Sequence, residues 1–195
     1  MMNKGILAGI IVIIAIVAVV GGYYGYGVYQ SNTYNDLLLK TEGENGTLIQ
    51  TGKILNETNF TTKSYETNIG NVKQAINLTD LTINQTQDMV NIAPDNATKE
   101  YAQLRLKQYK DLRSIEEMYL KLYEDIQASG IFGAIGTINA MTNETNRLTD
   151  EMTADQNSII SLVNSNPQLK NRLNQTLGEN QTNKLLEPAF KTTSN

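Results

Sequence analysis

Hydrophobic positions divide the chain into one continuous apolar run followed by several amphipathic segments. Apolar residues continue almost without interruption from Ile6 to Val20, and glycines and tyrosines extend the run to Tyr29. The 24 residues from Ile6 to Tyr29 would form a helix about 36 Å long, enough to cross a hydrocarbon core of about 30 Å. We therefore predict a transmembrane anchor over residues 1–29, with its tyrosines at the headgroups.

The charge beside this run predicts its orientation. Lys4 is the one charged side chain in residues 1–29. Because positive charge favours the cytoplasmic side, residues 1–4 are expected in the cytoplasm and the chain beyond the run outside the cell membrane. Two other interpretations share the pattern. The run could be a cleavable signal peptide that ends at Gly21-Gly22, or a buried helix of a soluble domain.

The beginning of the run also resembles the leader of a type IV pilin, in which a Lys-Gly pair such as Lys4-Gly5 precedes the apolar helix. The resemblance covers only this segment. Many such pilins carry an acidic residue five positions after the cleavage site, and Ile10 occupies that position here. The resemblance implies a pilin-like filament subunit as one alternative function.

A sevenfold repeat follows the run. The repeated positions are aliphatic with one exception: Leu48, Leu55, Thr62, Ile69, Ile76, Ile83 and Val90. The positions three residues further on are more polar: Thr51, Thr58, Tyr65, Val72, Thr79 and Thr86. A repeat of this length predicts one long coiled-coil-like helix from about Thr47 to Ile92, which begins after Gly43 and Gly46 and ends ahead of Pro94.

Three further helices are predicted downstream. Asp95 is a suitable N-cap for a helix over 96–129, and we assign its charged residues, Arg105 and Glu116 among them, to solvated faces. A third helix runs to about Val163. Asn166-Pro167 begins a fourth over 167–186, which Pro188 ends. The glycine-spaced apolar segment 130–136 predicts a buried turn between two helices, with a tip that contacts a membrane or a partner as the alternative.

These elements predict an all-α fold: a single N-terminal transmembrane helix followed by an extended antiparallel helical bundle with one long coiled-coil-like helix. We divide the chain into an anchor or signal peptide at 1–29, a juxtamembrane linker at 30–46, an extracytoplasmic helical bundle at 47–187 and a flexible tail at 188–195.

Glycosylation motifs agree with this topology. The motif Asn-x-Thr, an acceptor for N-glycosylation in exported chains, occurs nine times: at Asn45, Asn56, Asn59, Asn77, Asn84, Asn96, Asn143, Asn174 and Asn180. With 23 Asn and 29 Ser plus Thr in 195 residues, about three or four would arise by chance. All nine follow the apolar run, on the side expected outside the cell. The alternative is a solvated surface that is simply rich in Asn and Thr.

The composition lacks residue types on which many catalytic sites depend. The chain has no Cys and no His, so the commonest metal ligands and nucleophile–base pairs are missing. Its net charge is −4 with no basic block, which argues against nucleic-acid binding. Adjacent carboxylates at Glu116-Glu117 and Asp150-Glu151 point about 100° apart on a helix, so we interpret both as solvated faces. We predict no enzyme and name no catalytic, cofactor-binding or metal-ligating residue.

The pattern as a whole favours a membrane-anchored, N-glycosylated cell-surface protein with a structural or interaction role in the envelope, in adhesion or in assembly. Its partners would be the membrane and either another protein or further copies of itself. An extracytoplasmic sensory or solute-binding bundle that acts with a membrane partner is the other main alternative. The frequent Asn-x-Thr motifs and the absence of cysteine are archaeal-like features.

Overall fold

The computed structural model describes residues 29–58 and 64–188, in which every regular element is an α-helix. Residues 29–42 are helical. The helices that follow are α2 (Thr47–Asn56), α3 (Tyr65–Ile92), α4 (Asn96–Gly133), α5 (Ile135–Ser165), α6 (Pro167–Leu177) and α7 (Glu179–Leu185). The all-α prediction is confirmed for this part of the chain. None of the described helices is long and apolar enough to cross a membrane, and the predicted anchor lies, apart from Tyr29, outside the described residues.

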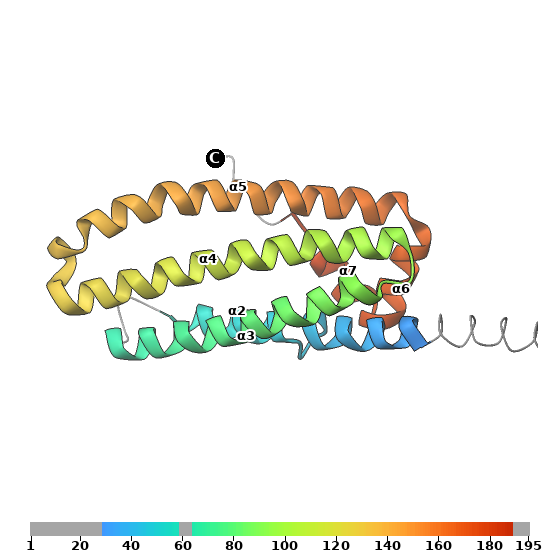
Figure 1. The fold of residues 1–195 in the computed structure, drawn as a ribbon, viewed down its shortest axis with the longest axis horizontal. Helices are drawn as coiled ribbons and strands as arrows, with labels where there is room; N and C mark the ends of the chain where they lie inside the picture. Colours follow the sequence, from blue (N-terminus) through green and yellow to red (C-terminus); the bar gives the residue numbers. More distant parts are fainter. Residues whose placement is uncertain (1–28, 59–63, 189–195) are drawn as a thin grey trace, which may run out of the picture.

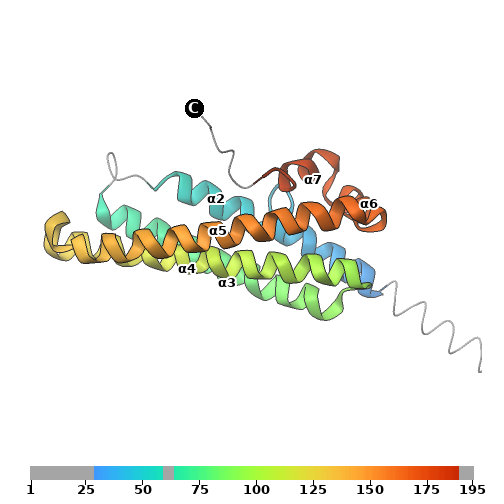
Figure 2. The ribbon, with the colours of Figure 1, turned by 90° about the horizontal axis from the view of Figure 1, so that it is seen from above.

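The helices form an elongated antiparallel bundle (Figure 1). Residues 29–42 and α2 run in one direction, α3 returns, α4 runs out again and α5 returns beside it. The long helix α4 packs against α3 and against α5. Helices α6 and α7 lie at the end of the bundle where residue 29 is placed, as both views show (Figures 1 and 2). The turn between α4 and α5 lies at the opposite end.

Most of the apolar core lies in the half of the bundle that contains residue 29. It combines side chains from residues 29–42, from the end of α3, the beginning of α4, the end of α5 and α6: Tyr34, Leu38, Met89, Val90, Tyr101, Ala102, Leu106, Ile159, Val163, Leu169 and Leu173. Two smaller clusters continue toward the α4–α5 turn, one around Val72 and Tyr123 and one around Leu122 and Ile126. The far half is therefore held by fewer apolar contacts.

The single long helix predicted over 47–92 is wrong. Its two ends are as expected, but α2 ends at Asn56 and α3 begins at Tyr65, and α2 packs against α3. The hydroxyls of Thr47 and Thr82 are hydrogen-bonded across the two helices. The intervening residues are rich in Asn and Thr, which are poor helix formers, and Ser64 caps α3 by accepting from the amide of Thr67 at 3.2 Å.

The polar positions of α3 are also more buried than the repeat suggested. Thr79, Thr82 and Thr86 are each about 1% exposed, whereas Ile69 and Ile83 are only half-buried. The Thr82 hydroxyl donates to the carbonyl of Leu78 at 2.9 Å, and Thr86 donates to that of Thr82 at 2.7 Å. Because these hydroxyls bond to their own helix, the threonines can present their methyl groups to the core.

Residues 30–46, expected to be a linker, are instead part of the packed bundle. Most of the segment is helical, and Tyr34 and Leu38 are fully buried in the main core. The Tyr34 hydroxyl donates to the carbonyl of Thr98 on α4 at 3.3 Å. The spacing of Tyr34, Leu38 and Thr41 is that of one helical face, a sequence signal that the linker assignment overlooked.

Local signals for helix ends were more reliable. Asp95 caps α4 by accepting from the amide of Thr98 at 2.8 Å, and Pro167 is the first residue of α6. The predicted helix over 167–186 is divided, because Gly178, at φ 84°, separates α6 from α7. The Asn166 side chain does not cap α6 and donates instead to the carbonyl of Leu162 at 2.7 Å. The predicted tail beyond 188 lies outside the described residues.

Candidate functional site

The asparagines of the Asn-x-Thr motifs lie mainly on the solvent side of the helices. Seven are exposed: Asn45, Asn56, Asn77, Asn84, Asn96, Asn143 and Asn180. Asn174 is half-buried, and Asn59 lies outside the described residues. The threonines of five motifs are buried: Thr47, Thr79, Thr86, Thr98 and Thr182. Residues two apart lie on nearly opposite sides of a helix, so the same motif supplies a solvated amide and a core threonine.

The turn between α4 and α5 forms an exposed apolar tip, which we define as Ile131, Phe132 and Ile135. These side chains are 58%, 90% and 49% exposed. Gly130, at φ 71°, ends the regular part of α4, and both views show the turn extending past the beginning of α3 (Figures 1 and 2). The glycines therefore mark the turn as predicted, but its burial was predicted wrongly, because no described element covers this end of the bundle.

A buried ionic cluster links residues 29–42 to α4. The carboxylate of Glu42 is about 1% exposed and accepts from the hydroxyls of Tyr101 and of Tyr109, the latter at 2.6 Å. Arg105 Nε lies 3.4 Å from Glu42 Oε1. Burial raises the pKa of both tyrosines, so their hydroxyls stay protonated and donate.

Arg105 also bonds to residues of α5 and α7. Its guanidinium donates to Gln156 on α5 at 3.1 Å and to the carbonyl of Leu185 on α7 at 3.1 Å. Burial alone would lower the pKa of Arg105, but the adjacent Tyr101 and Glu42 raise it above its ordinary value. The cluster is enclosed and extensively hydrogen-bonded, so its role is to fasten elements together.

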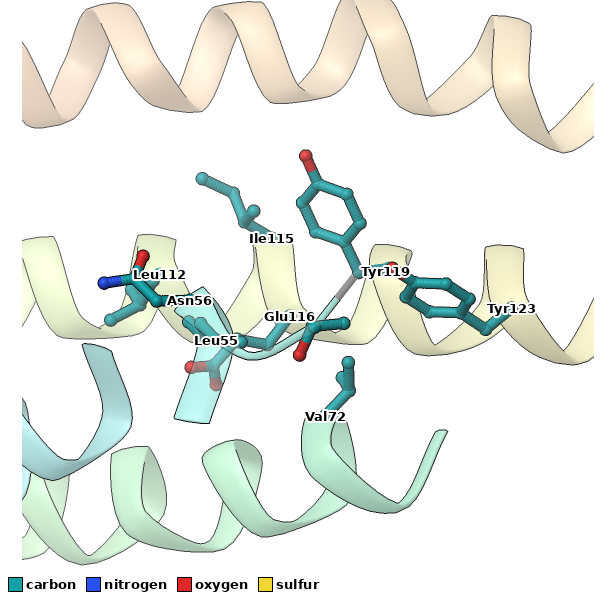
Figure 3. A pocket seen from close by; sticks show the side chains of 9 residues that line it. Leu55, Asn56, Val72, Leu112, Ile115, Glu116, Tyr119 and Tyr123 are labelled. Atoms are coloured by element: carbon teal, nitrogen blue, oxygen red, sulfur yellow. The ribbon is translucent and has the colours of Figure 1, made fainter. Parts of the chain in front are cut away.

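A cavity of about 350 Å³ opens on the flank of the bundle, between the end of α2, α3 and α4 (Figure 3). Its described wall is mainly aliphatic and aromatic, and Glu116 is the one carboxyl group among these residues: Leu55, Asn56, Thr58, Val72, Leu112, Ile115, Glu116, Tyr119 and Tyr123. In Figure 3 the Glu116 side chain extends from α4 into the space between the three helices. A small, mostly apolar cavity with a few polar groups is typical of sites for small molecules.

Glu116 is the unusual member of this wall. The residue is about 1% exposed, and its Oε1 accepts from the Thr79 hydroxyl at 2.8 Å, whereas Oε2 is buried without a hydrogen-bond partner. Leaving such an oxygen unpaired costs about 1–3 kcal/mol. Burial raises the pKa of Glu116 to about 7, against the lowering effect of Thr79 and Arg113. The carboxyl is thus poised to gain or lose a proton near neutral pH.

Comparison with family models, with curated proteins and with solved structures finds no match to this chain.

The site must therefore be interpreted from its own residues. Within residues 29–58 and 64–188, no group of three or more acidic side chains is placed to hold a metal ion. Among the described residues, the cavity beside Glu116 and the apolar tip are two features that could contact another molecule.

The sequence interpretation missed Arg105 and Glu116, which it placed on solvated faces. Both are buried. Arg105 lies four residues after Tyr101 and four before Tyr109, so all three share one face of α4. Glu116 likewise lies four residues after Leu112. Their position inside an apolar stripe was the available signal, although charged residues are mostly exposed.

Proposed function

We propose that this chain is a membrane-anchored, N-glycosylated surface protein that contacts a protein partner through its apolar tip. The observation that carries the proposal is the 90% exposure of Phe132 at the end of the bundle farthest from residue 29. If residues 1–29 anchor the chain, the tip is presented away from the membrane. The regular part of α4 spans about 50 Å, so the tip would stand well clear of the lipid.

The charges near the tip favour a protein over a lipid surface. Between Lys121 and Arg147 the sequence has no basic residue and three acidic ones, Glu124, Asp125 and Glu144. Anionic membrane surfaces attract Lys and Arg, but Lys73, Lys121 and Arg147 are each paired with one of these three acids, so they are not free to bind such a surface. An apolar recess on a partner, with a neutral or basic rim, complements Phe132 and its neighbours.

Photo-crosslinking on intact cells tests the proposal. A photoreactive residue at Ile135 should give one discrete adduct with a surface protein, and the same residue at exposed Gln103, near the other end of α4, should not. Phe132→Asp should abolish the adduct, and excess unlabelled full-length chain should compete for it. Equal labelling at the two positions, or an adduct unaffected by Phe132→Asp, would refute the role of the tip. Recovery of the chain outside the membrane fraction would refute the anchor.

A second candidate function, solute binding, is favoured by the cavity beside Glu116. The cavity lies on the flank of the bundle and shares no residue with the tip. A bundle that binds a small molecule there could still contact a partner at its end, so the two roles are compatible and separately testable.

A further inference from the structure

The wall of the cavity combines two kinds of recognition chemistry. Leu55, Val72, Leu112 and Ile115 offer an aliphatic surface, and Tyr119 and Tyr123 add two aromatic rings. The wall also contains one buried carboxyl oxygen, Oε2 of Glu116, to which none of the described residues donates a hydrogen bond. A ligand that fills the cavity should therefore have an apolar body and one hydrogen-bond donor directed at Glu116.

The charges around the cavity favour a positively charged donor. The described residues that line it include no Lys or Arg, so a ligand anion would meet a carboxyl group with nothing to offset it. The nearest cation on α4, Arg113, is already paired with Asp80 of α3 at 2.8 Å and with Glu117 at 2.9 Å. Tyrosine rings attract organic cations through their faces.

The size of the cavity limits the ligand. A volume of about 350 Å³ is near the lower end of the range for small-molecule sites, so it suits one ring or a short chain. Access from solvent is available beside Asn56 and Tyr119, both of which are exposed.

We propose that this cavity binds a small organic amine, in which the ammonium group donates to Oε2 of Glu116 and the apolar part packs between Leu112, Ile115 and the two tyrosine rings. This inference rests on solute binding, the second of the proposed functions, and is independent of the apolar tip. Oε1 keeps its hydrogen bond from Thr79, so the carboxylate is held in place while Oε2 receives the ligand.

Isothermal titration of the full-length chain in detergent, at pH 8, tests this with three probes of matched size: phenethylamine, phenethyl alcohol and 3-phenylpropanoate. Phenethylamine should bind saturably, at least tenfold more tightly than the alcohol, and the carboxylate should not bind. Glu116→Gln should weaken amine binding at least tenfold. Glu117→Gln removes an adjacent, exposed carboxylate of the same helix and should leave the affinity unchanged.

The outcomes distinguish failure of the preference for an amine from failure of solute binding itself. If amine and alcohol bind equally and Glu116→Gln has no effect, the cavity binds solutes but the preference for a cation is wrong. If none of the probes binds at millimolar concentration, solute binding at this cavity is refuted as well. Val72→Phe, which fills the cavity from α3, should abolish binding while the helical circular-dichroism spectrum is retained.

Discussion

The most unusual individual residues of this bundle are charged residues that are buried. Glu42 and Arg105 are buried together, and tyrosine hydroxyls and glutamine amides complete their hydrogen bonds. Glu116 is equally buried but has one bonded oxygen and one unsatisfied oxygen. The first arrangement serves to join distant parts of the chain. The second costs stability unless a proton or a ligand compensates it.

Replacing Glu116 by Gln should change how stability depends on pH. Its pKa in the folded chain is about 7, against an ordinary 4.5, so the unfolded chain loses the proton first as pH rises. The contribution of Glu116 to wild-type stability is therefore highest below about pH 4.5 and declines up to pH 7, by at most about 3 kcal/mol. Glu116→Gln should not show this decline, and urea unfolding at pH 4.5, 6 and 8 measures the difference. If the stability of Glu116→Gln falls with pH as the wild-type stability does, the decline is not due to Glu116.

Replacing Arg105 by Met should strongly destabilise the fold, because it leaves Glu42 buried without its cation. Breaking a buried pair in this way costs roughly 3–5 kcal/mol. The double variant Arg105→Met with Glu42→Leu should recover part of that loss, since no uncompensated charge remains. Denaturant unfolding measures the stability of both variants, and Arg147→Met, on the surface of α5, is the control. If Arg105→Met unfolds like Arg147→Met, the cluster does not fasten the bundle.

At the scale of the elements, helix boundaries depend on a few residues each. Asp95 and Ser64 cap the helices that follow them, and Gly130 and Gly178 occupy left-handed conformations where helices end. The boundaries at Asp95 and Gly130 follow from the local sequence, whereas the division at Gly178 and the boundary between α2 and α3 were not predicted. There the sevenfold repeat continues through residues whose propensity is low, and packing of α2 on α3 ends the helix.

Gly130→Ala should destabilise the turn between α4 and α5. At φ 71° and ψ 174° the backbone occupies a region that is almost restricted to glycine, so a side chain there costs about 1–3 kcal/mol. Gly70 offers a matched control in the interior of α3, where a Cβ atom would meet nothing within 4 Å. Gly70→Ala should stabilise the fold by up to about 1 kcal/mol. The unfolding temperatures of the two variants should shift in opposite directions from that of the wild type. If both temperatures rise or both fall, the result would contradict the turn geometry.

Across the whole molecule, apolar packing is unevenly distributed. The main core joins five parts of the chain near residue 29, whereas the half that bears the tip has two small clusters. Stability within a folded chain follows local packing, so the two ends are expected to open independently.

Hydrogen exchange should reveal this asymmetry. Backbone amides of residues 101–106 and 159–163, in the main core, should exchange at least tenfold more slowly than those of residues 122–126 and 138–148. Mass-spectrometric exchange of the full-length chain measures both sets at once. Uniform protection along α4 and α5 would instead mean that the bundle opens as one unit.

The all-α class, the turns at Gly43–Gly46, Pro94 and Gly130, the cap at Asp95 and the helix start at Pro167 follow from the sequence alone. Each of these depends on residues adjacent in the chain, whose hydrogen bonds and backbone preferences are local. The apolar run and the nine Asn-x-Thr motifs also follow from sequence alone, and the anchor and glycans that they predict remain predictions.

Which polar residues are buried and which apolar ones are exposed depends on the tertiary structure. Arg105 is buried because Glu42, 63 positions earlier, lies against it, and Glu116 because Thr79 on α3 faces it. Phe132 is exposed because no described element reaches the tip. Burial depends on partners distant in the chain, and spacing along one helix indicates which residues share a face but not what covers that face.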